Sequence, residues 1–391
     1  MNSVLEKFVF DDPTKLVYGE GVLKELPEHL KAMGATSVML VCDQGIVKAG
    51  IADKVADLIR KTEGVKLCLF DKIMANPLDT IMDEGFEFAR ENNVDVVVGS
   101  GGGSSLDSAK GIALLMTNGG KLREYLMEGK EVREKIAPTI CIPTTAGTGS
   151  EVTRTVVATD HVTRFKDGFK NPDTIVADVA LLDPELMANL PSKILAACGM
   201  DALTHAIESY TSWKANPVTD SLNLHAVKLI GANIRQAFAQ PANLNAKGRM
   251  LLASCMTGIA FDQAGLGIAH CMGHPLGGLY DVPHGVACAM TLPVTMKYNL
   301  ISCPEKMAEI AVALGENIDG CTSLEAGEKA IVAVQRLMQD FDLPMRLSDL
   351  GIGEDAIPKL AEDAMGFPGM RGANPRDIDQ AGMEKLFREL L

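Results

Sequence analysis

Aromatic residues and positive charge are both scarce in this chain. Only 5% of its 391 residues are aromatic, there is a single Trp, and the formal net charge is −14. Proteins that bind single-stranded nucleic acid stack bases on aromatic side chains, and binding to a phosphate backbone requires a positive field. Because no run of Lys and Arg offsets this deficit, we expect no nucleic-acid partner.

Long apolar runs and paired cysteines are missing as well. No stretch reaches the ~18 apolar residues of a membrane-spanning helix. The first ten residues carry Glu6 and Lys7 where a signal peptide would have an uninterrupted apolar region. The nine cysteines are scattered singly, without a C-x-x-C pair, as in proteins of a reducing compartment. These features predict a cytoplasmic protein with no membrane partner.

Two different hydrophobic patterns along the chain predict two domains. At ~100–200 residues per domain the length also suggests two. Up to residue 185, short apolar runs alternate with amphipathic stretches, which predicts an α/β domain with a parallel, doubly wound sheet. From 186 to 391 nearly everything has a 3.6-residue period, which predicts an all-helical domain. The expected strands are 37–42, 66–70, 94–98 and 139–142, and the expected helices between them are 46–60, 79–92 and 104–116.

The N-terminus has its own pattern. Residues 6–10 and 15–18 are extended in character and are separated by Asp11, Asp12 and Pro13, which favour a turn. We therefore expect a separate β-hairpin, whose edge strand could pair with a second copy of the chain.

A glycine loop follows the expected strand at 94–98. Gly101, Gly102 and Gly103 lack Cβ atoms, so a phosphate could approach the main chain there, and Ser104 and Asp107 could cap the next helix. The loop is not a G-x-G-x-x-G fingerprint, because position 104 is Ser. From this loop alone, a tight strand-to-helix turn explains the residues as well as phosphate binding does.

A second polar glycine loop spans 143–152 and also follows a buried strand. Its threonine hydroxyls and free amides suit another edge of the same ligand. Two such loops at the carboxyl ends of adjacent parallel strands favour a dinucleotide. The candidate residues of this second loop are Thr144, Thr145 and Thr148.

Histidines and one aspartate recur at helical spacing in the second half. Asp201 and His205 are four residues apart, as are His270 and His274. His284 follows His270 by 14 positions (284 − 270) after a glycine-rich break. Imidazoles set among Gly, Ala, Leu and Ile need a partner, and a metal ion is a frequent one. The alternative is that these are core histidines hydrogen-bonded to backbone carbonyls, which we expect for the remaining histidines: His29, His161 and His225.

These segments together resemble the iron-containing (group III) alcohol dehydrogenases. The resemblance runs from the N-terminal residues to Asn374–Arg376, and four separated segments occur in the family's order. It implies a Rossmann-like dinucleotide-binding domain, a helical domain and an active site in the cleft between them. One departure is Met370, which stands where some relatives carry Cys.

The resemblance also implies a role for each candidate residue. The metal ligands would be Asp201, His205, His270 and His284, and His274 would act on the substrate or its proton. The residues implied for the cofactor are Asp43, Asn76, Gly101, Gly102, Gly103, Ser104, Asp107, Thr144, Thr145, Thr148 and Lys166.

Alternatives remain open for Asp43 and for one further residue, Phe261. Asp43 would accept a hydrogen bond from the adenosine ribose, and its charge would repel a 2′-phosphate, so NAD is expected over NADP. Asp43 could instead be the N-cap of the helix from Ile46. Phe261 matches a position that lines the substrate pocket in the family, but it could equally be a core residue.

One carboxylate and three imidazoles suit several divalent ions, and the family name favours Fe2+ with Zn2+ next. An alcohol bound to such an ion loses its proton easily, and the alkoxide passes hydride to the nicotinamide. The expected function is therefore hydride transfer between NAD(H) and a small primary alcohol, aldehyde or short diol. The alternatives are a glycerol or polyol dehydrogenase, a cyclase resembling dehydroquinate synthase, a metallohydrolase, or an inactive scaffold protein. We expect a homodimer or larger homo-oligomer.

Overall fold

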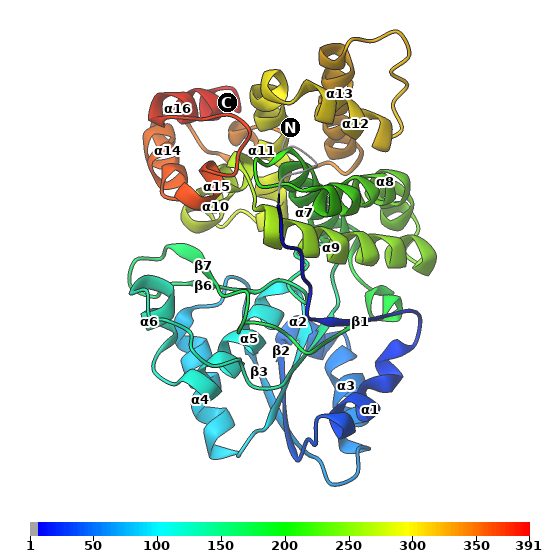
Figure 1. The fold of residues 1–391 in the computed structure, drawn as a ribbon, viewed down its shortest axis with the longest axis vertical. Helices are drawn as coiled ribbons and strands as arrows, with labels where there is room; N and C mark the ends of the chain where they lie inside the picture. The colour runs from blue at the N-terminus through cyan, green and yellow to red at the C-terminus, as the bar shows by residue number, and fades with distance from the viewer. Residues whose placement is uncertain (1–6) are drawn as a thin grey trace. The chain divides into compact units, whose positions relative to one another are not determined.

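The structure is a computed structural model that describes residues 7–391 (Figure 1). The chain forms two compact units. One comprises Asp11–Leu190, and the other comprises Pro191–Leu391 together with residues 7–10. The domain boundary predicted from the sequence, at residue 185, lies a few residues before this division.

The first unit is built on a six-stranded parallel sheet in the order β1-β8-β5-β4-β2-β3. This confirms the predicted doubly wound α/β fold. A two-stranded antiparallel ribbon, β6-β7, accompanies the sheet. The strands are β1 (Lys15–Tyr18), β2 (Ser37–Asp43), β3 (Lys66–Ile73), β4 (Val96–Gly101), β5 (Thr139–Pro143), β6 (Thr155–Thr159), β7 (Lys166–Lys170) and β8 (Val179–Leu182).

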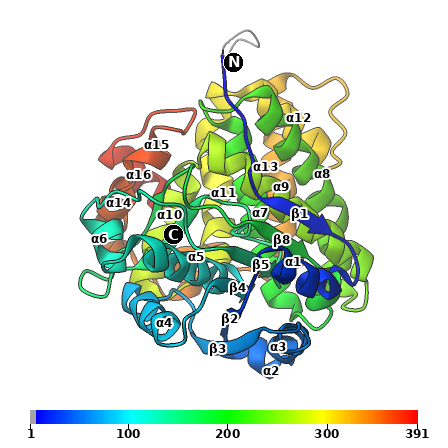
Figure 2. The same cartoon turned by 60° about the horizontal axis from the view of Figure 1, so that its bottom comes forward.

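Helices cover both faces of this sheet. Successive residues of a strand point to opposite faces, so β2 contributes Val38 and Leu40 to one apolar core and Met39 and Val41 to the other. Figure 2 shows α4 and α5 on one side of the sheet and α1 and α3 on the other. The helices of this unit are α1 (Leu26–Ala32), α2 (Gln44–Lys48), α3 (Ile51–Arg60), α4 (Asp79–Glu91), α5 (Gly103–Asn118) and α6 (Leu122–Met127).

Two local predictions are wrong. Residues 7–10 form no strand, and β1 pairs in parallel with β8 instead of with the N-terminal segment, so there is no hairpin; Glu6 lies outside the described residues. A two-stranded hairpin is marginal alone, whereas β8 offers a buried strand that needs a neighbour. The helix expected at 46–60 is two helices, because Gly50 adopts a left-handed conformation (φ 70°) between α2 and α3.

The second unit is helical, as predicted. Its longest buried element is α7, in which every residue from Gly199 to Thr211 is buried. Helices α8, α9 and α11 pack against α7. The helices are α7 (Ser192–Thr211), α8 (Pro217–Ala239), α9 (Leu244–Ala264), α10 (Ile268–Tyr280), α11 (His284–Asn299), α12 (Pro304–Ala313), α13 (Ser323–Asp340), α14 (Ile357–Met365), α15 (Pro368–Arg371) and α16 (Gln380–Arg388).

Within residues 7–391, no single helix is both long and apolar enough to cross a membrane. Helices α9 and α10 meet the length and composition requirement only when taken together, and the chain bends by 107° between them.

Candidate metal centre and cofactor loops

The candidate metal centre begins on α7. Asp201 and His205 lie one helical turn apart, so both side chains project from the same face. Both residues are buried, with exposed fractions of 3% and 4%. A buried carboxylate is costly unless it is paired, so this position calls for partners from other elements.

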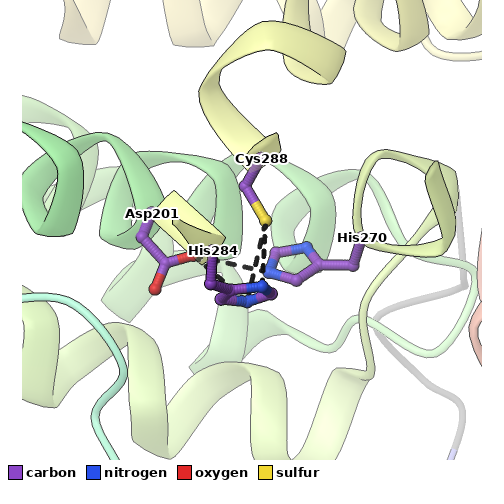
Figure 3. Close-up of side chains that lie close together, drawn as sticks. All are labelled: Asp201, His270, His284 and Cys288. Carbon is purple, nitrogen blue, oxygen red and sulfur yellow. Dashed lines mark hydrogen bonds and ion pairs between the residues drawn. The ribbon is translucent and has the colours of Figure 1, made fainter. Parts of the chain in front are cut away.

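Helices α10 and α11 supply those partners. His270 lies in the first turn of α10, and His284 is the first residue of α11. The close approach of α11 to α7 depends on Gly285, because a Cβ at this position would lie 2.2 Å from the carbonyl oxygen of Ala197. Figure 3 shows Asp201, His270 and His284 converging from these three helices.

Three imidazole nitrogens surround one carboxylate oxygen. The Nε2 atoms of His205, His270 and His284 lie 3.9, 3.8 and 3.7 Å from Oδ1 of Asp201. Ligands bound at ~2.0–2.2 Å in a tetrahedral arrangement are about 3.4 Å apart. Within residues 7–391, Asp201 Oδ1 and His270 Nε2 are buried without a hydrogen-bond partner. Asp201, His270 and His284 therefore fit a single divalent cation, and His205 lies close to the same carboxylate oxygen.

Electrostatics in the cluster keep the carboxylate ionised. Burial alone would raise the pKa of Asp201, but the surrounding imidazoles of His205, His284 and His270 outweigh it and hold this pKa far below its usual range. The aspartate is thus in the form that binds a cation at neutral pH.

Cys288 is a member of this cluster that the sequence analysis missed. It lies one turn after His284 on α11, and its Sγ is 3.7 Å from Nε2 of His284. Ligand atoms of Asp201, His270, His284 and Cys288 all lie within 4.8 Å of one another. Burial raises the pKa of the Cys288 thiol to about 11. The four-residue spacing between His284 and Cys288 is the signal in the sequence, because on a helix it places both side chains on one face.

His274 and Phe261 border the cluster. The ring of His274 lies 5.4 Å from that of His284 and 4.7 Å from that of Phe367, measured between centroids. Phe261, on α9, stacks on His205 with centroids 4.4 Å apart. Both side chains are therefore adjacent to the candidate metal ligands.

A separate histidine contact lies in the first unit. His161 donates through Nδ1 to Oδ2 of Asp79 at 2.9 Å, and Asp160 beside it accepts from Arg123 and Thr163. Burial opposes ionisation of Asp160, but the bonds from Thr163 and Arg123 lower its pKa to about 2. These carboxylates are already paired within the protein.

The two candidate cofactor loops lie side by side because β4 and β5 are neighbouring parallel strands. The amide of Thr144 donates to the carbonyl of Gly101 at 3.0 Å. A Cβ at Gly103 would lie 2.7 Å from Cγ2 of Thr148. Strand pairing therefore brings both loops to the carboxyl edge of the sheet, where doubly wound folds bind ligands.

The predicted capping of α5 is wrong. The helix begins at Gly103 with Gly102 as its N-cap, and no side chain caps it, so Ser104 lies inside the first turn. Asp107 accepts from the Ser150 hydroxyl and pairs with Lys110 at 2.9 Å instead of closing a capping box. Helix amides without a side-chain cap are suited to an anion such as a pyrophosphate.

Asp43 is the N-cap of α2, as the alternative interpretation predicted. Its Oδ1 accepts from the amides of Gly45 and Ile46 at 2.7 and 3.1 Å, while Oδ2 accepts from the Ser105 hydroxyl at 3.0 Å. The last bond ties the end of β2 to the glycine loop.

Asn76 and Lys166 also come together. Nζ of Lys166, on β7, donates to Oδ1 of Asn76 at 2.9 Å. Asn76 adopts a left-handed conformation (φ 51°) between β3 and α4. The structure thus joins two candidate cofactor residues that are 90 positions apart in the chain.

A buried lysine holds the threonine loop against α5. Nζ of Lys110 donates to the carbonyl oxygens of Ser150 and Thr155 at 2.9 and 2.6 Å. Glu151 lies beside these contacts with 2% of its surface exposed, and its Oε1 has no hydrogen-bond partner in the described part of the chain. Burial raises the pKa of Glu151 to about 7, although Lys110 acts in the opposite direction.

This pKa predicts a pH-dependent stability. In the unfolded chain Glu151 titrates near 4.5, so between pH 4.5 and 7 the folded protein holds a proton that the unfolded chain has released. Stability should fall as pH rises through this window, by about 3 kcal/mol in total. We expect Glu151→Gln to flatten the decline in Tm between pH 5 and 8, measured by calorimetry. An unchanged slope in this variant would show that other groups cause the decline.

Comparisons with known proteins define the class. Residues 13–184 match the family described as iron-containing alcohol dehydrogenase, and residues 195–391 match the Fe-containing alcohol dehydrogenase family, C-terminal. The chain belongs to this family of oxidoreductases.

Several relatives match over nearly their whole length. The 1,3-propanediol dehydrogenase of Klebsiella pneumoniae is 41% identical over 383 residues, covering 96% of this chain and 97% of the relative. Lactaldehyde reductase of Escherichia coli strain K12 is 34% identical over 95% of this chain and 96% of its own. The crystal structure of a 1,3-propanediol oxidoreductase superimposes with a TM-score of 0.94 at 40% identity, covering 99% of this chain and all of the other.

Proposed function

We propose that this protein interconverts small primary alcohols or short diols and their aldehydes, with NAD(H) as the hydride carrier. The observation that carries the proposal is the convergence of three imidazole nitrogens, 3.7–3.9 Å away, on a buried oxygen of Asp201. The names of the relatives, which concern 1,3-propanediol, methanol and lactaldehyde, favour the same substrate class.

The proposed roles follow from the chemistry of the side chains. Asp201, His205, His270 and His284 would hold a divalent cation, which when bound acts as a Lewis acid on the substrate oxygen. His274, beside His284, would carry the proton that the alcohol loses or bind a second hydroxyl. The amides at the start of α5 would bind the pyrophosphate, and the threonine loop would bind the nicotinamide side.

The family name favours Fe2+, with Zn2+ as the next candidate. Intrinsic affinity of imidazole and carboxylate ligands favours Zn2+ over Fe2+, so availability and oxygen exposure decide between them. The buried thiol of Cys288 near the cluster adds a soft donor, which favours Zn2+. Metal analysis of anaerobically purified protein would identify the ion.

Asp43 is proposed to select NAD over NADP through repulsion of a 2′-phosphate. Asparagine also caps helices well, so Asp43→Asn should retain the contacts with Gly45 and Ile46 while removing the charge. We expect the ratio of kcat/KM for NAD over NADP to fall about tenfold in this variant, since loss of ~1.4 kcal/mol of discrimination is a factor of ten. A ratio equal to that of the wild type would remove Asp43 from the selectivity determinants.

A cytoplasmic homodimer or larger assembly is the proposed state of the protein. Strand β1 is an edge of the six-stranded sheet and exposes Leu16 and Tyr18 by 41% and 44%. Unpaired edge strands with apolar side chains favour pairing with another chain. Mass determination by light scattering, before and after Leu16→Lys, would test this interface.

A substrate panel followed at 340 nm tests the activity. We expect NAD-linked turnover of 1,3-propanediol, lactaldehyde or a short alcohol in the presence of Fe2+ or Zn2+. Preferential turnover of glycerol or larger polyols would favour the polyol alternative. Ester or phosphoester hydrolysis without NADH binding would favour the metallohydrolase, and metal content unaffected by Asp201→Ala would favour the scaffold protein.

A further inference from the structure

We propose that Glu208 is a positioning residue whose buried carboxylate fixes the tautomer and orientation of His270, and thereby tightens cation binding at the proposed centre. The inference rests on the proposed metal centre and concerns a residue that the sequence analysis did not single out.

Glu208 lies on the same face of α7 as the proposed ligands. It lies seven residues after Asp201 and three residues after His205, and both spacings place side chains on one face of a helix. Only 5% of its surface is exposed. Oε2 of Glu208 lies 2.5 Å from Nδ1 of His270. One helix thus supplies two proposed ligands and the carboxylate that contacts a third.

The contact determines which imidazole nitrogen is free. An ionised carboxylate can only accept hydrogen bonds, so Nδ1 of His270 must carry the proton and donate it to Glu208. In the neutral ring the lone pair is then on Nε2, which is the atom that lies 3.8 Å from Oδ1 of Asp201. A carboxylate behind the imidazole also increases the basicity of the ligand nitrogen.

The other oxygen of Glu208 fixes the carboxylate itself. Oε1 accepts from the amide of Ala269 at 2.5 Å, at the N-terminus of α10, which no local side chain caps. A Cβ at Gly267 would lie 2.9 Å from this oxygen. Because both oxygens have a donor and a glycine leaves the space open, Glu208 is held by α10 while it orients His270 on the same helix.

The charges of the cluster point to a divalent cation. Among the described residues neither Asp201 nor Glu208 forms an ion pair with Lys or Arg, and the charged-group contacts of both carboxylates are with imidazoles. Two buried negative charges are unfavourable without a counter-charge. A divalent ion at the proposed ligands would balance both carboxylates, which gives Glu208 a role in affinity as well as in geometry.

Binding of Zn(II) and Co(II) to metal-free protein tests the inference with a readout other than activity. We expect Glu208→Gln to weaken Zn(II) binding by about 10–100-fold and to alter the visible spectrum of bound Co(II). The matched control is Glu309→Gln. The Glu309 carboxylate, on α12, accepts from the hydroxyl of Tyr210, which lies on α7 like Glu208, and it does not touch the cluster. The control should bind both metals as the wild type does.

A purely structural cap on α10 predicts a different result. In that case Glu208→Gln would lower the Tm of the metal-free protein while Zn(II) affinity and the Co(II) spectrum stayed within about twofold of the wild type, which would overturn the inference. Gly267→Ala provides a second variant that keeps the charge, because its Cβ would lie 2.9 Å from Oε1 of Glu208 and equally close to Oδ1 of Asn374. We expect a smaller loss of Zn(II) affinity for it, and if Glu208→Gln does not fold, Gly267→Ala decides.

The outcome also separates this inference from the proposed function. If the wild type binds metal and oxidises alcohols but both variants bind Zn(II) normally, only the role of Glu208 is wrong. If the wild type binds neither Zn(II) nor Co(II), the proposed metal centre itself is wrong, and the inference with it.

Discussion

Replacing His284 with alanine is expected to remove most of the bound metal and to lower kcat/KM for a short alcohol by about 10³-fold, since Lewis-acid stabilisation contributes several kcal/mol and each 1.36 kcal/mol is a factor of ten. His284 suits this test because it begins α11 and its side chain is 27% exposed, so its loss leaves the core intact. Metal content by mass spectrometry and steady-state rates at 340 nm provide the measurements.

The matched control is His225→Ala. His225 is an exposed residue of α8, outside the cluster. We expect this variant to keep the metal content and kcat/KM of the wild type. A His284→Ala protein that retains full metal and activity would exclude His284 as a ligand and leave Cys288, one turn along the same helix, as the alternative donor from α11.

The second large effect is expected for Gly103→Ala in the glycine loop. The new Cβ would lie 2.7 Å from Cγ2 of Thr148, so either the threonine loop or the start of α5 must move. Misplacement of a bound group by ~1 Å can cost about 10²-fold in rate, and we expect kcat/KM for NAD to fall by this order. Metal content should not change, because Gly103 and the proposed ligands belong to different units.

A rescue variant identifies the cause of that loss. Thr148→Ala removes Cγ2 and Oγ1, and only Cβ would remain, at 3.1 Å from the new methyl group of Gly103→Ala. The double variant should therefore bind NADH, measured by fluorescence titration, more tightly than Gly103→Ala alone. If the double variant is no better, the effect comes from the helix start itself and not from the contact between the loops.

The strands of the central sheet could be predicted because their signal is local. Val96, Val97 and Val98 are buried on both faces of the sheet, so the strand shows as an unbroken apolar run. The residues of the edge strand β1 were predictable, but its pairing was not, because its partner β8 lies about 160 residues further along the chain. Proximity in sequence favours a hairpin between residues 6–10 and β1. In the folded protein β1 pairs instead with the buried strand β8.

The prediction of the candidate site from the sequence was limited for a similar reason. His270 and His274 have the same helical spacing and similar apolar surroundings, so the sequence cannot tell them apart from the residues alone. In the fold, Nε2 of His270 lies 3.8 Å from Asp201, whereas His274 packs against Phe367. No feature of the sequence distinguishes Glu208, because a glutamate on a helix is normally solvated. The burial of Glu208 depends on its contacts with α10.

What the sequence determined by itself is the alternation of buried strands and helices, the all-helical second half and the residue types able to bind a cation and a dinucleotide. These follow from periodicity and composition, which act over a few residues. Only the tertiary structure decided that Cys288 joins the cluster, that Glu208 contacts His270, and that Asp107 contacts Lys110 and Ser150 instead of capping α5. Such contacts depend on how separate helices and loops pack, because distances of a few ångströms between distant residues are set by the whole core and not by local pattern.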